Sequence, residues 1–312
     1  MSKNTDNDLK TIIEQYSTES NTNDIKSVDK KCAPGIKFGQ YSCISLDVLV
    51  KLATNYNKHN PNNMIELNRN YEILYPKKYK KYLVDELTEK FKNTCSNQHC
   101  WLTTKYAEKI IDKYNKKLTE IFFRPIGPQG KFTWLNTINI NQVMDQFHHL
   151  YDDFIFLGAV PMDFMQVASY KYIQNLQVKE LLEHKKTRIG IIYNLDNHNQ
   201  PGSHWVAGYI DINKPVIYYY DSYATRPGKR VREFYDKLQK DIKATTQKEP
   251  IIDYNKTRNQ YGDSECGMFS LYFIISLLKG IDFEKACKEM PDDKTINEKR
   301  KELFILPEEL KK

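Results

Sequence analysis

Gln260–Gly280 reads QYGDSECGMFSLYFIISLLKG, and the rest of the fold is expected to be arranged around this stretch. A polar loop ends at Cys266, and Met268–Leu278 is then apolar on nearly every face before a Lys-Gly pair stops the run. A helix that is apolar on all sides belongs in the interior of a domain. The pattern therefore predicts a buried helix that begins at Cys266.

A cysteine at the start of a buried helix can act as a nucleophile. The unpaired N–H groups and the positive dipole end of a helix N-terminus stabilise an anion, so a thiolate forms more easily there. We expect Gly267 to let a substrate approach the backbone closely, and we expect the Cys266 N–H and the Gln260 amide to face a developing oxyanion. Taken alone, Cys266 is also consistent with a small buried hydrophobe, as most free cysteines are.

The composition indicates a globular chain with a large domain and a smaller one. The chain has 312 residues, of which 40% are hydrophobic and 12% aromatic, which is ample for a packed core. Six cysteines are too sparse for a disulfide scaffold, and the N-terminus lacks the pattern of a signal peptide. We therefore expect a reducing compartment. The longest apolar run falls short of the roughly 20 residues of a bilayer span, so no membrane span is expected.

The net charge is +7, which permits association with nucleic acid or with an acidic surface. Lysines and arginines are spread along the chain, however, with only short clusters such as Lys77–Lys81. A solvated basic face and a nucleic-acid site both remain open, and the first is favoured.

The pattern divides the chain into three parts. Residues 1–30 are polar and are expected to form a flexible arm. Residues 31–120 are expected to form a helical domain, with helices from Ser45 onward, over 79–91 and over 103–118. Residues 121–312 form the third part, and the turn-forming segment Arg124–Gly130 marks its start.

Cys95 and Cys100 are separated by four residues, which falls within the spacing of zinc ligands. Cys32 and Cys43 could complete such a site. No second close pair accompanies them, so buried thiols are the favoured interpretation.

The third part shows a mixture of helix and strand patterns, which indicates an α+β fold. A helix capped by Asn141 is expected first, carrying Phe147 and reaching Phe154. Three strands rich in Ile, Val and Tyr and separated by turns follow at 189–195, 204–210 and 216–221, and we expect them to be antiparallel neighbours. After them we expect a helix over 227–244, a strand at 250–254, the helix from Cys266, and amphipathic segments at 283–290 and 296–306.

His204 and Asp221 fall at matching ends of two of these strands. His204 opens one strand and Asp221 ends the next, so an antiparallel pairing places them side by side at one edge of the sheet. Asp221 can then hold one imidazole nitrogen while the other faces Cys266. Each residue alone has an ordinary structural explanation, but together with Gln260 they predict a cysteine protease.

The order His204-Trp205, Asp221-Ser222, Gln260 and Cys266-Gly267 resembles the ubiquitin-like-protein-specific protease superfamily, which includes adenovirus protease. Within it, the segments 123–128, 134–136, 139–141 and 161–164 and the Cys95–Cys100 spacing look like the polyprotein-processing proteases of large cytoplasmic DNA viruses, the African swine fever virus and poxvirus type. The resemblance covers about residues 120–280 well and the N-terminal part loosely.

The resemblance implies a papain-like, adenain-like core with a central mixed, largely antiparallel sheet flanked by helices and a buried helix that starts at Cys266. It also implies that no cofactor is needed and that cleavage follows small residues, at Gly-Gly-X or Ala-Gly-X sites. The substrate would thread through a narrow aromatic slot, with Trp205 as its roof and Trp134 as a candidate for the opposite wall. Core packing is the alternative role for both tryptophans.

Three functions remain open at this stage. The first is a cysteine endopeptidase that matures viral structural polyproteins, located in the virion and in the host cytoplasm. The second is a deconjugating protease for ubiquitin-like modifiers, because the same slot accepts a Gly-Gly tail. The third is an inactive basic virion protein that is structural or binds nucleic acid. In each case the basic N-terminal region could associate with DNA or with a capsid partner.

Overall fold

The computed structural model describes residues 9, 11, 13, 26–110 and 117–311. The chain divides into two compact units, Met1–Ile126 with Phe304–Lys312, and Gly127–Leu303. The second unit thus begins a few residues later than the sequence pattern suggests, and the last residues of the chain belong to the first unit. Among the described residues, no helix is both long enough and apolar enough to cross a bilayer.

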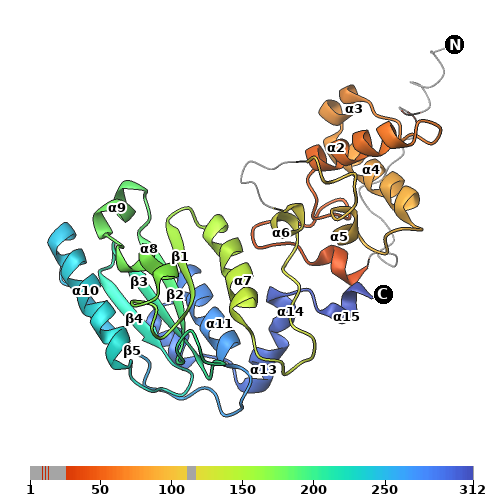
Figure 1. The fold of residues 1–312 in the computed structure, drawn as a ribbon. Helices are drawn as coiled ribbons and strands as arrows, with labels where there is room; N and C mark the ends of the chain where they lie inside the picture. The colour runs from red at the N-terminus through yellow and green to blue at the C-terminus, as the bar shows by residue number, and fades with distance from the viewer. Residues whose placement is uncertain (1–8, 10, 12, 14–25, 111–116, 312) are drawn as a thin grey trace. The chain divides into compact units, whose positions relative to one another are not determined.

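The first unit is helical and packs around one apolar cluster (Figure 1). Most of the expected flexible arm lies outside the described residues. Leu9 and Ile13, which are described, are fully buried in this cluster. The elements of this unit are η2 (Ser27–Lys30), α2 (Leu46–His59), α3 (Arg69–Leu74), α4 (Pro76–Phe91), α5 (Gln98–Trp101), α6 (Leu118–Phe122) and α15 (Pro307–Leu310).

The helices expected after Ser45 and over 79–91 are confirmed as α2 and α4. The helix expected over 103–118 is wrong for residues 103–110, because residues 103–109 form turns and bends, and residues 111–116 of it lie outside the described part of the chain; α6 begins at Leu118. The backbone there makes other hydrogen bonds. Thr103 and Thr104 donate their hydroxyls to carbonyls three residues back, and Asn55 donates to the Tyr106 carbonyl at 2.9 Å. Helical periodicity alone did not reveal this competition.

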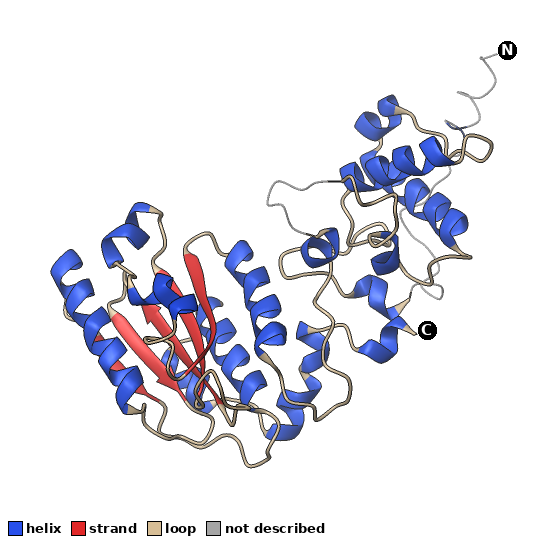
Figure 2. Ribbon diagram, in the orientation of Figure 1, coloured by secondary structure: helices blue, strands red, loops and turns tan. Residues whose placement is uncertain are grey.

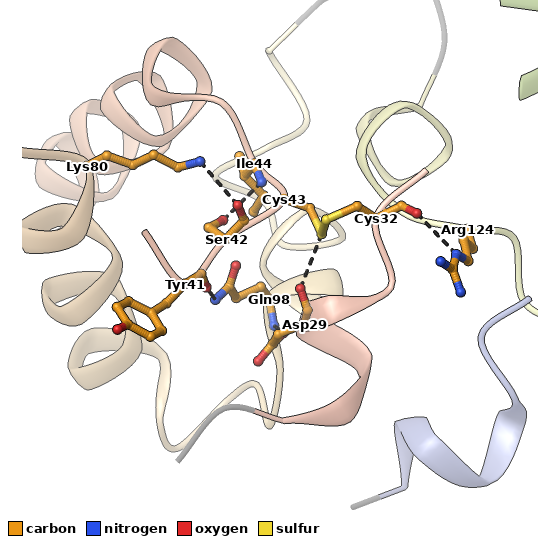
Figure 3. Close-up of a disulfide and its surroundings, with 9 residues drawn as sticks. All are labelled: Asp29, Cys32, Tyr41, Ser42, Cys43, Ile44, Lys80, Gln98 and Arg124. Carbon is orange, nitrogen blue, oxygen red and sulfur yellow. Dashed lines mark hydrogen bonds between the residues drawn. A yellow bond between two sulfur atoms is a disulfide. The ribbon is translucent and has the colours of Figure 1, made fainter. Parts of the chain in front are cut away.

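Four of the six cysteines form two disulfides, Cys32–Cys43 and Cys95–Cys100. The expectations of buried free thiols and of a zinc site are therefore both wrong for these four residues. Figure 3 shows how Gln98 lies beside the first disulfide: its backbone N–H donates to Asp29 at 2.7 Å and its amide donates to the Tyr41 carbonyl at 2.6 Å. Disulfides also argue against the uniformly reducing compartment that the sparse cysteines suggested.

The second unit is built on a mixed sheet with helices on both faces, which confirms the α+β expectation (Figure 2). In the described residues five strands pair in the order β1-β2-β3-β4-β5, namely β1 (Phe154–Pro161), β2 (Arg188–Asn194), β3 (Trp205–Asp211), β4 (Val216–Tyr220) and β5 (Ile251–Tyr254). The three expected antiparallel neighbours are confirmed as β2, β3 and β4. The two outer pairs, β1 with β2 and β4 with β5, are parallel, so the sheet is evenly mixed and not largely antiparallel.

Two glycines leave room for neighbouring side chains on the sheet. Gly208 on β3 leaves room for Tyr235 of α10 (Lys229–Thr246), and Gly190 on β2 leaves room for the Phe154 ring of β1, while Ile274 of α11 (Cys266–Leu278) lies at ordinary contact distance. A side chain at Gly208 would collide with Tyr235, and one at Gly190 would collide with Phe154. The remaining elements are α7 (Thr137–Leu150), η3 (Ala168–Tyr170), α8 (Lys171–Gln174), α9 (Val178–Glu183), α12 (Phe283–Lys288), α13 (Asp293–Glu298) and α14 (Arg300–Leu303).

The start of this unit differs from the sequence prediction. Helix α7 begins at Thr137, not after Asn141, because the side chains of Asn136 and Asn139 cap it reciprocally. Phe154 does not belong to this helix but opens β1, a strand that the periodicity did not reveal. The result is a rigid helix and strand directly after the loop that carries Trp134 and Leu135.

Candidate active site

Cys266 is the first residue of α11, and its side chain is buried with 2% exposure. All of α11 except Tyr272 is buried, as its sequence predicts. The helix is therefore embedded in the core, and the N–H groups of its first turn lie beside Cys266. An anion formed on the Cys266 sulfur lies where the helix dipole stabilises it.

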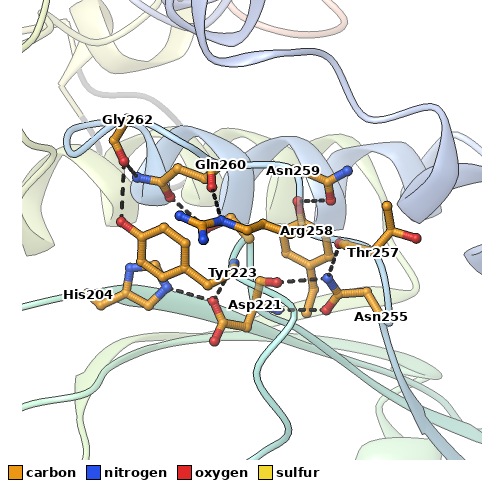
Figure 4. A network of polar contacts seen from close by, with 11 residues as sticks. His204, Asp221, Tyr223, Asn255, Thr257, Arg258, Asn259, Gln260 and Gly262 are labelled. Atoms are coloured by element: carbon orange, nitrogen blue, oxygen red, sulfur yellow. Dashed lines mark hydrogen bonds and ion pairs between the residues drawn. The ribbon is translucent and has the colours of Figure 1, made fainter.

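His204 lies between Asp221 and Cys266. Its Nε2 contacts Asp221 Oδ1 at 2.7 Å (Figure 4). A hydrogen bond with the Cys266 thiol also acts on the ring. Because Nε2 is used by Asp221, the nitrogen that faces the thiol is Nδ1. Burial lowers the pKa of His204, but the hydrogen bonds to Asp221 and Cys266, together with their charges, outweigh burial and raise it to about 9. The imidazole is therefore held as a cation beside the sulfur at neutral pH.

Antiparallel pairing explains this contact. Ala207 pairs with Tyr220 in the β3–β4 ladder, so the residue before β3 and the residue after β4 meet at the same edge of the sheet. His204 and Asp221 occupy these two positions. The juxtaposition expected from the sequence is thus present in the structure.

The side chain of Gln260 is fully buried and held at both ends. Its Oε1 accepts a hydrogen bond from Ser222 Oγ at 2.6 Å, and its Nε2 donates to the Gly262 carbonyl at 2.9 Å. A primary amide has two N–H donors, so one remains to bind an oxyanion. Ser222 thereby fixes which end of the amide carries the donors.

Trp205 and Trp134 occupy different environments. Trp205 is 5% exposed, and its Nε1 donates to the Leu135 carbonyl at 2.8 Å. Trp134 is 44% exposed and borders two surface hollows. The first hollow, of about 320 Å³, also includes Trp205, whereas the second includes Gly262 and residues 263–265. Trp134 is thus the more exposed of the two rings, and Trp205 lies largely beneath the surface.

Gly267 has a different role from the one expected from the sequence. A side chain at this position would come within 3.0 Å of the Leu135 side chain, so the space beside Gly267 is filled by protein and not by substrate. Leu135 in turn holds Trp205 through its carbonyl. Gly267 therefore allows the segment around residue 135 to pack directly on α11.

Two positioning residues escaped the sequence analysis. Tyr223 stacks on the His204 ring, with centroids 4.6 Å apart and planes 15° apart, and its hydroxyl donates to the Gly262 carbonyl at 3.2 Å. Asn255 is buried and bridges the backbone of Asp221, accepting from its N–H at 2.9 Å and donating to its carbonyl at 2.7 Å. No local pattern distinguishes these residues from ordinary turn and loop residues.

Within the described ranges, no cluster of three or more His, Cys, Asp or Glu side chains could hold a metal ion. Cys287 is buried and is not part of a disulfide. Burial and the charge of Asp253 outweigh the nearby Lys256 and raise the pKa of its thiol to about 12. Of the two free cysteines, only Cys266 has an imidazole partner.

This geometry can be compared with known proteins. The model of the Ulp1 protease family, C-terminal catalytic domain, matches residues 173–307, a span that contains His204, Asp221, Gln260 and Cys266. A thiol protease of Acanthamoeba polyphaga mimivirus is 33% identical over 269 residues, covering 84% of this chain and 89% of the relative. The chain belongs to the Ulp1 protease family. It is therefore a cysteine protease.

Other members of the Ulp1 family extend the similarity over the whole fold. The cysteine protease of African swine fever virus is 24% identical over 262 residues, covering 78% of this chain and 95% of the relative. The crystal structure of an African swine fever virus protease superposes with a TM-score of 0.60 at 17% identity, covering 92% of this chain and all of the other. The resemblance to proteases of large DNA viruses is confirmed, and the shared fold includes the N-terminal unit.

Proposed function

We propose that this Ulp1-family protease hydrolyses peptide bonds with Cys266 as nucleophile, His204 as general base and acid, Asp221 as the group that orients the imidazole, and Gln260 as an oxyanion donor. The observation that carries the proposal is the contact of one imidazole with both the Asp221 carboxylate and the Cys266 thiol. In the resting pair the thiol proton resides on His204 Nδ1, so the reactive species are an imidazolium and a thiolate.

The reaction then proceeds in two steps. The thiolate attacks the peptide carbonyl carbon, and the resulting oxyanion accepts hydrogen bonds from the Cys266 N–H and from the free N–H of Gln260. The His204 imidazolium donates its proton to the leaving amine as the C–N bond breaks. Water, deprotonated by His204, hydrolyses the thioester and releases the carboxylate product, and the C–S electron pair returns to sulfur.

We further propose cleavage after glycine, at Gly-Gly-X or Ala-Gly-X sites of viral structural polyproteins during virion maturation. Trp134 borders both hollows, so a substrate that crosses the site passes beside its ring. Trp205 lines the first hollow and completes the aromatic wall. Flat rings leave little room for a β-carbon, so the preference for glycine is steric. The relatives are proteases of viruses, which fits a viral protein as substrate.

The test compares wild type with Cys266→Ala on a series of Gly-Gly-X peptides, with Ala replacing the glycine before the cleaved bond in matched controls. We expect cleavage by wild type only, with kcat/KM at least ten-fold lower for the alanine peptides. Activity that survives in Cys266→Ala would overturn the triad. Equal cleavage of the glycine and alanine peptides would overturn the steric slot.

A second candidate function is the processing of ubiquitin-like modifiers. The family match favours it, and African swine fever virus relatives that are 24% identical to this chain carry the name SUMO-1 cysteine protease. Parallel assays on a ubiquitin-like precursor and on a viral core polyprotein separate the two. Modifier processing without polyprotein cleavage would replace the first candidate by the second. The inactive virion protein is not retained, because the chain is a cysteine protease.

Location and further partners are also proposals. We place the mature protein in the virion and its synthesis in the host cytoplasm, and the two disulfides fit the virion better than a reducing cytoplasm. Thiol alkylation of protein from particles and from cell lysate tests this. Association of the basic N-terminal region with DNA or a capsid partner is tested by salt titration, because phosphate contacts weaken steeply with salt.

A further inference from the structure

The loop between Gln260 and Cys266 must hold two oxyanion donors in one place, yet it has no regular secondary structure. Residues 262–264 form bends between two residues without regular structure, and Tyr261 is 73% exposed. The N–H of Cys266 and the amide of Gln260 lie at its two ends. The distance between these two donors therefore depends on the contacts that hold residues 261–265 in position.

Helix α13 contacts the first half of this loop. The Asp293 carboxylate accepts two backbone hydrogen bonds through a single oxygen, from the N–H of Tyr261 at 2.9 Å and from the N–H of Gly262 at 3.0 Å. Both N–H groups point at the same acceptor, so the backbone at this point is fixed against α13. Gly262 is also the residue whose carbonyl receives the Gln260 and Tyr223 side chains.

Asn297 and Arg300 contact the second half of the loop. Asn297 donates to Glu265 Oε1 and accepts from Arg300 Nε at 3.0 Å, while an Arg300 guanidinium N–H donates to the Ser264 carbonyl at 3.4 Å. Glu265, Asn297 and Arg300 are each only 3% exposed. Glu265 also binds the N–H and hydroxyl of Ser264, so a connected buried network ends directly at Cys266.

The charges of this network also bear on the nucleophile. Burial lowers the pKa of Arg300, and the charges of Glu265 and Cys266 oppose that effect. Arg300 is thus a buried cation within electrostatic range of the sulfur. Its Nη1 finds no hydrogen-bond partner in the described part of the chain, so its charge is only partly compensated.

We propose that Asp293, Asn297 and Arg300 are positioning residues for the hydrolysis, forming a C-terminal clamp that sets the separation of the two oxyanion donors and the placement of Cys266. This inference rests on the proposed function. It assigns a role to residues more than 25 positions after the nucleophile that make no contact with Asp221 or His204 in the hydrogen-bond network described above. If the clamp only stabilised the fold, its variants would unfold more easily, but the folded enzyme would keep its wild-type kcat and KM.

The experiment measures kcat, KM and amide hydrogen exchange for Asp293→Ala, Asp293→Asn, Asn297→Ala, Arg300→Met and Arg300→Lys in the full chain. Glu298→Ala is the matched control, because Glu298 is exposed on the same helix. We expect the Ala and Met variants to lower kcat by up to about 100-fold with KM nearly unchanged, since a displacement of about 1 Å has that effect. Asp293→Asn and Arg300→Lys should restore part of the loss.

Hydrogen exchange reports the loop directly. Peptides covering residues 258–266 should exchange faster in Asp293→Ala, while the core peptides of α11 remain protected. If wild type cleaves and Cys266→Ala does not, but the clamp variants keep wild-type kcat, the clamp is overturned and the proposed function stands. If wild type cleaves no peptide or polyprotein, the proposed function itself fails. Because Arg300 is buried, the Arg300→Met variant could unfold. In that case the two variants at the half-buried Asp293, Asp293→Ala and Asp293→Asn, decide the outcome.

Discussion

The imidazole of His204 lies flat against the phenol ring of Tyr223, with ring centroids 4.6 Å apart, and the Tyr223 hydroxyl donates to the Gly262 carbonyl. One side chain thus connects the imidazole of His204 with the loop between Gln260 and Cys266 (Figure 4). The Arg258 guanidinium also lies over the Tyr223 ring, with its guanidinium carbon 5.0 Å from the ring centroid. His204 is therefore held by stacking as well as by Asp221.

Replacement of Tyr223 separates these two roles. Tyr223→Phe keeps the stack and removes only the hydrogen bond to Gly262, so we expect kcat to fall a few-fold. Tyr223→Leu removes the ring, and we expect a fall of about ten-fold, the equivalent of one aromatic stacking interaction. Steady-state kinetics on one Gly-Gly-X peptide measures both. Identical kcat for Leu and wild type would show that stacking does not position His204.

The pH dependence follows from the raised pKa of His204, about 9 compared with an ordinary value of 6.5. Because the folded-state pKa is the higher one, the imidazolium stabilises the fold fully below pH 6.5, and this contribution is lost as pH rises through 9. We expect kcat/KM to fall above about pH 9. Removing the acid in Asp221→Asn should move that limb to lower pH. Urea unfolding of wild type and His204→Ala at pH 6 and pH 10 measures the effect on stability. The difference in unfolding free energy between the two proteins should be smaller at pH 10 than at pH 6.

Thiol labelling should identify a single reactive cysteine. Four cysteines are in disulfides, and burial raises the pKa of Cys287 to about 12, which leaves Cys266 as the reactive thiol at neutral pH. Mass spectrometry after brief exposure to iodoacetamide should find one adduct on wild type and none on Cys266→Ala. Denaturation without reduction should raise the wild-type count to two. A native adduct on Cys287 would contradict the burial of that thiol.

Gly267→Ala should disturb the packing of the segment that holds Trp205. The new β-carbon would come within 3.0 Å of Leu135, so either Leu135 or α11 must shift. We expect a loss of about 1–3 kcal/mol in unfolding free energy, as for other overpacked sites, and a higher KM for Gly-Gly-X peptides. Gly39→Ala is the control, because no heavy atom lies within 4 Å of a β-carbon there. Equal stability of the two variants would refute this packing argument.

The disulfides should stabilise the first unit. The Cys32–Cys43 bridge spans a sequence separation of 11 residues, for which the chain-entropy estimate is about 3 kcal/mol. We expect the double variant Cys32→Ser/Cys43→Ser to lower the melting temperature, and dithiothreitol to lower that of wild type but to have less effect on the variant. Calorimetry with and without reductant measures this. A melting temperature that is insensitive to reductant would show that the thiols are not paired.

Much of the site could be predicted from local patterns and strand order. The buried helix at Cys266 follows from its unbroken apolar run, and the meeting of His204 with Asp221 follows from two consecutive antiparallel strands. Both depend on residues close together in the chain, or on a pairing rule that leaves one arrangement. The β1 strand was missed because Phe154 continues the apolar pattern of α7, and only its parallel pairing with β2 reveals it.

Sequence by itself therefore determined the buried helix at Cys266, the meeting of His204 with Asp221, and the protease family, because local periodicity and residue order carry that information. Tertiary structure alone decided that Tyr223 stacks on His204, that Leu135 fills the space beside Gly267, that Asp293 and Arg300 hold the loop before Cys266, and that four cysteines pair. These contacts join segments distant along the chain. Their partners are selected by how the packed elements meet in space, which no local pattern of side chains records.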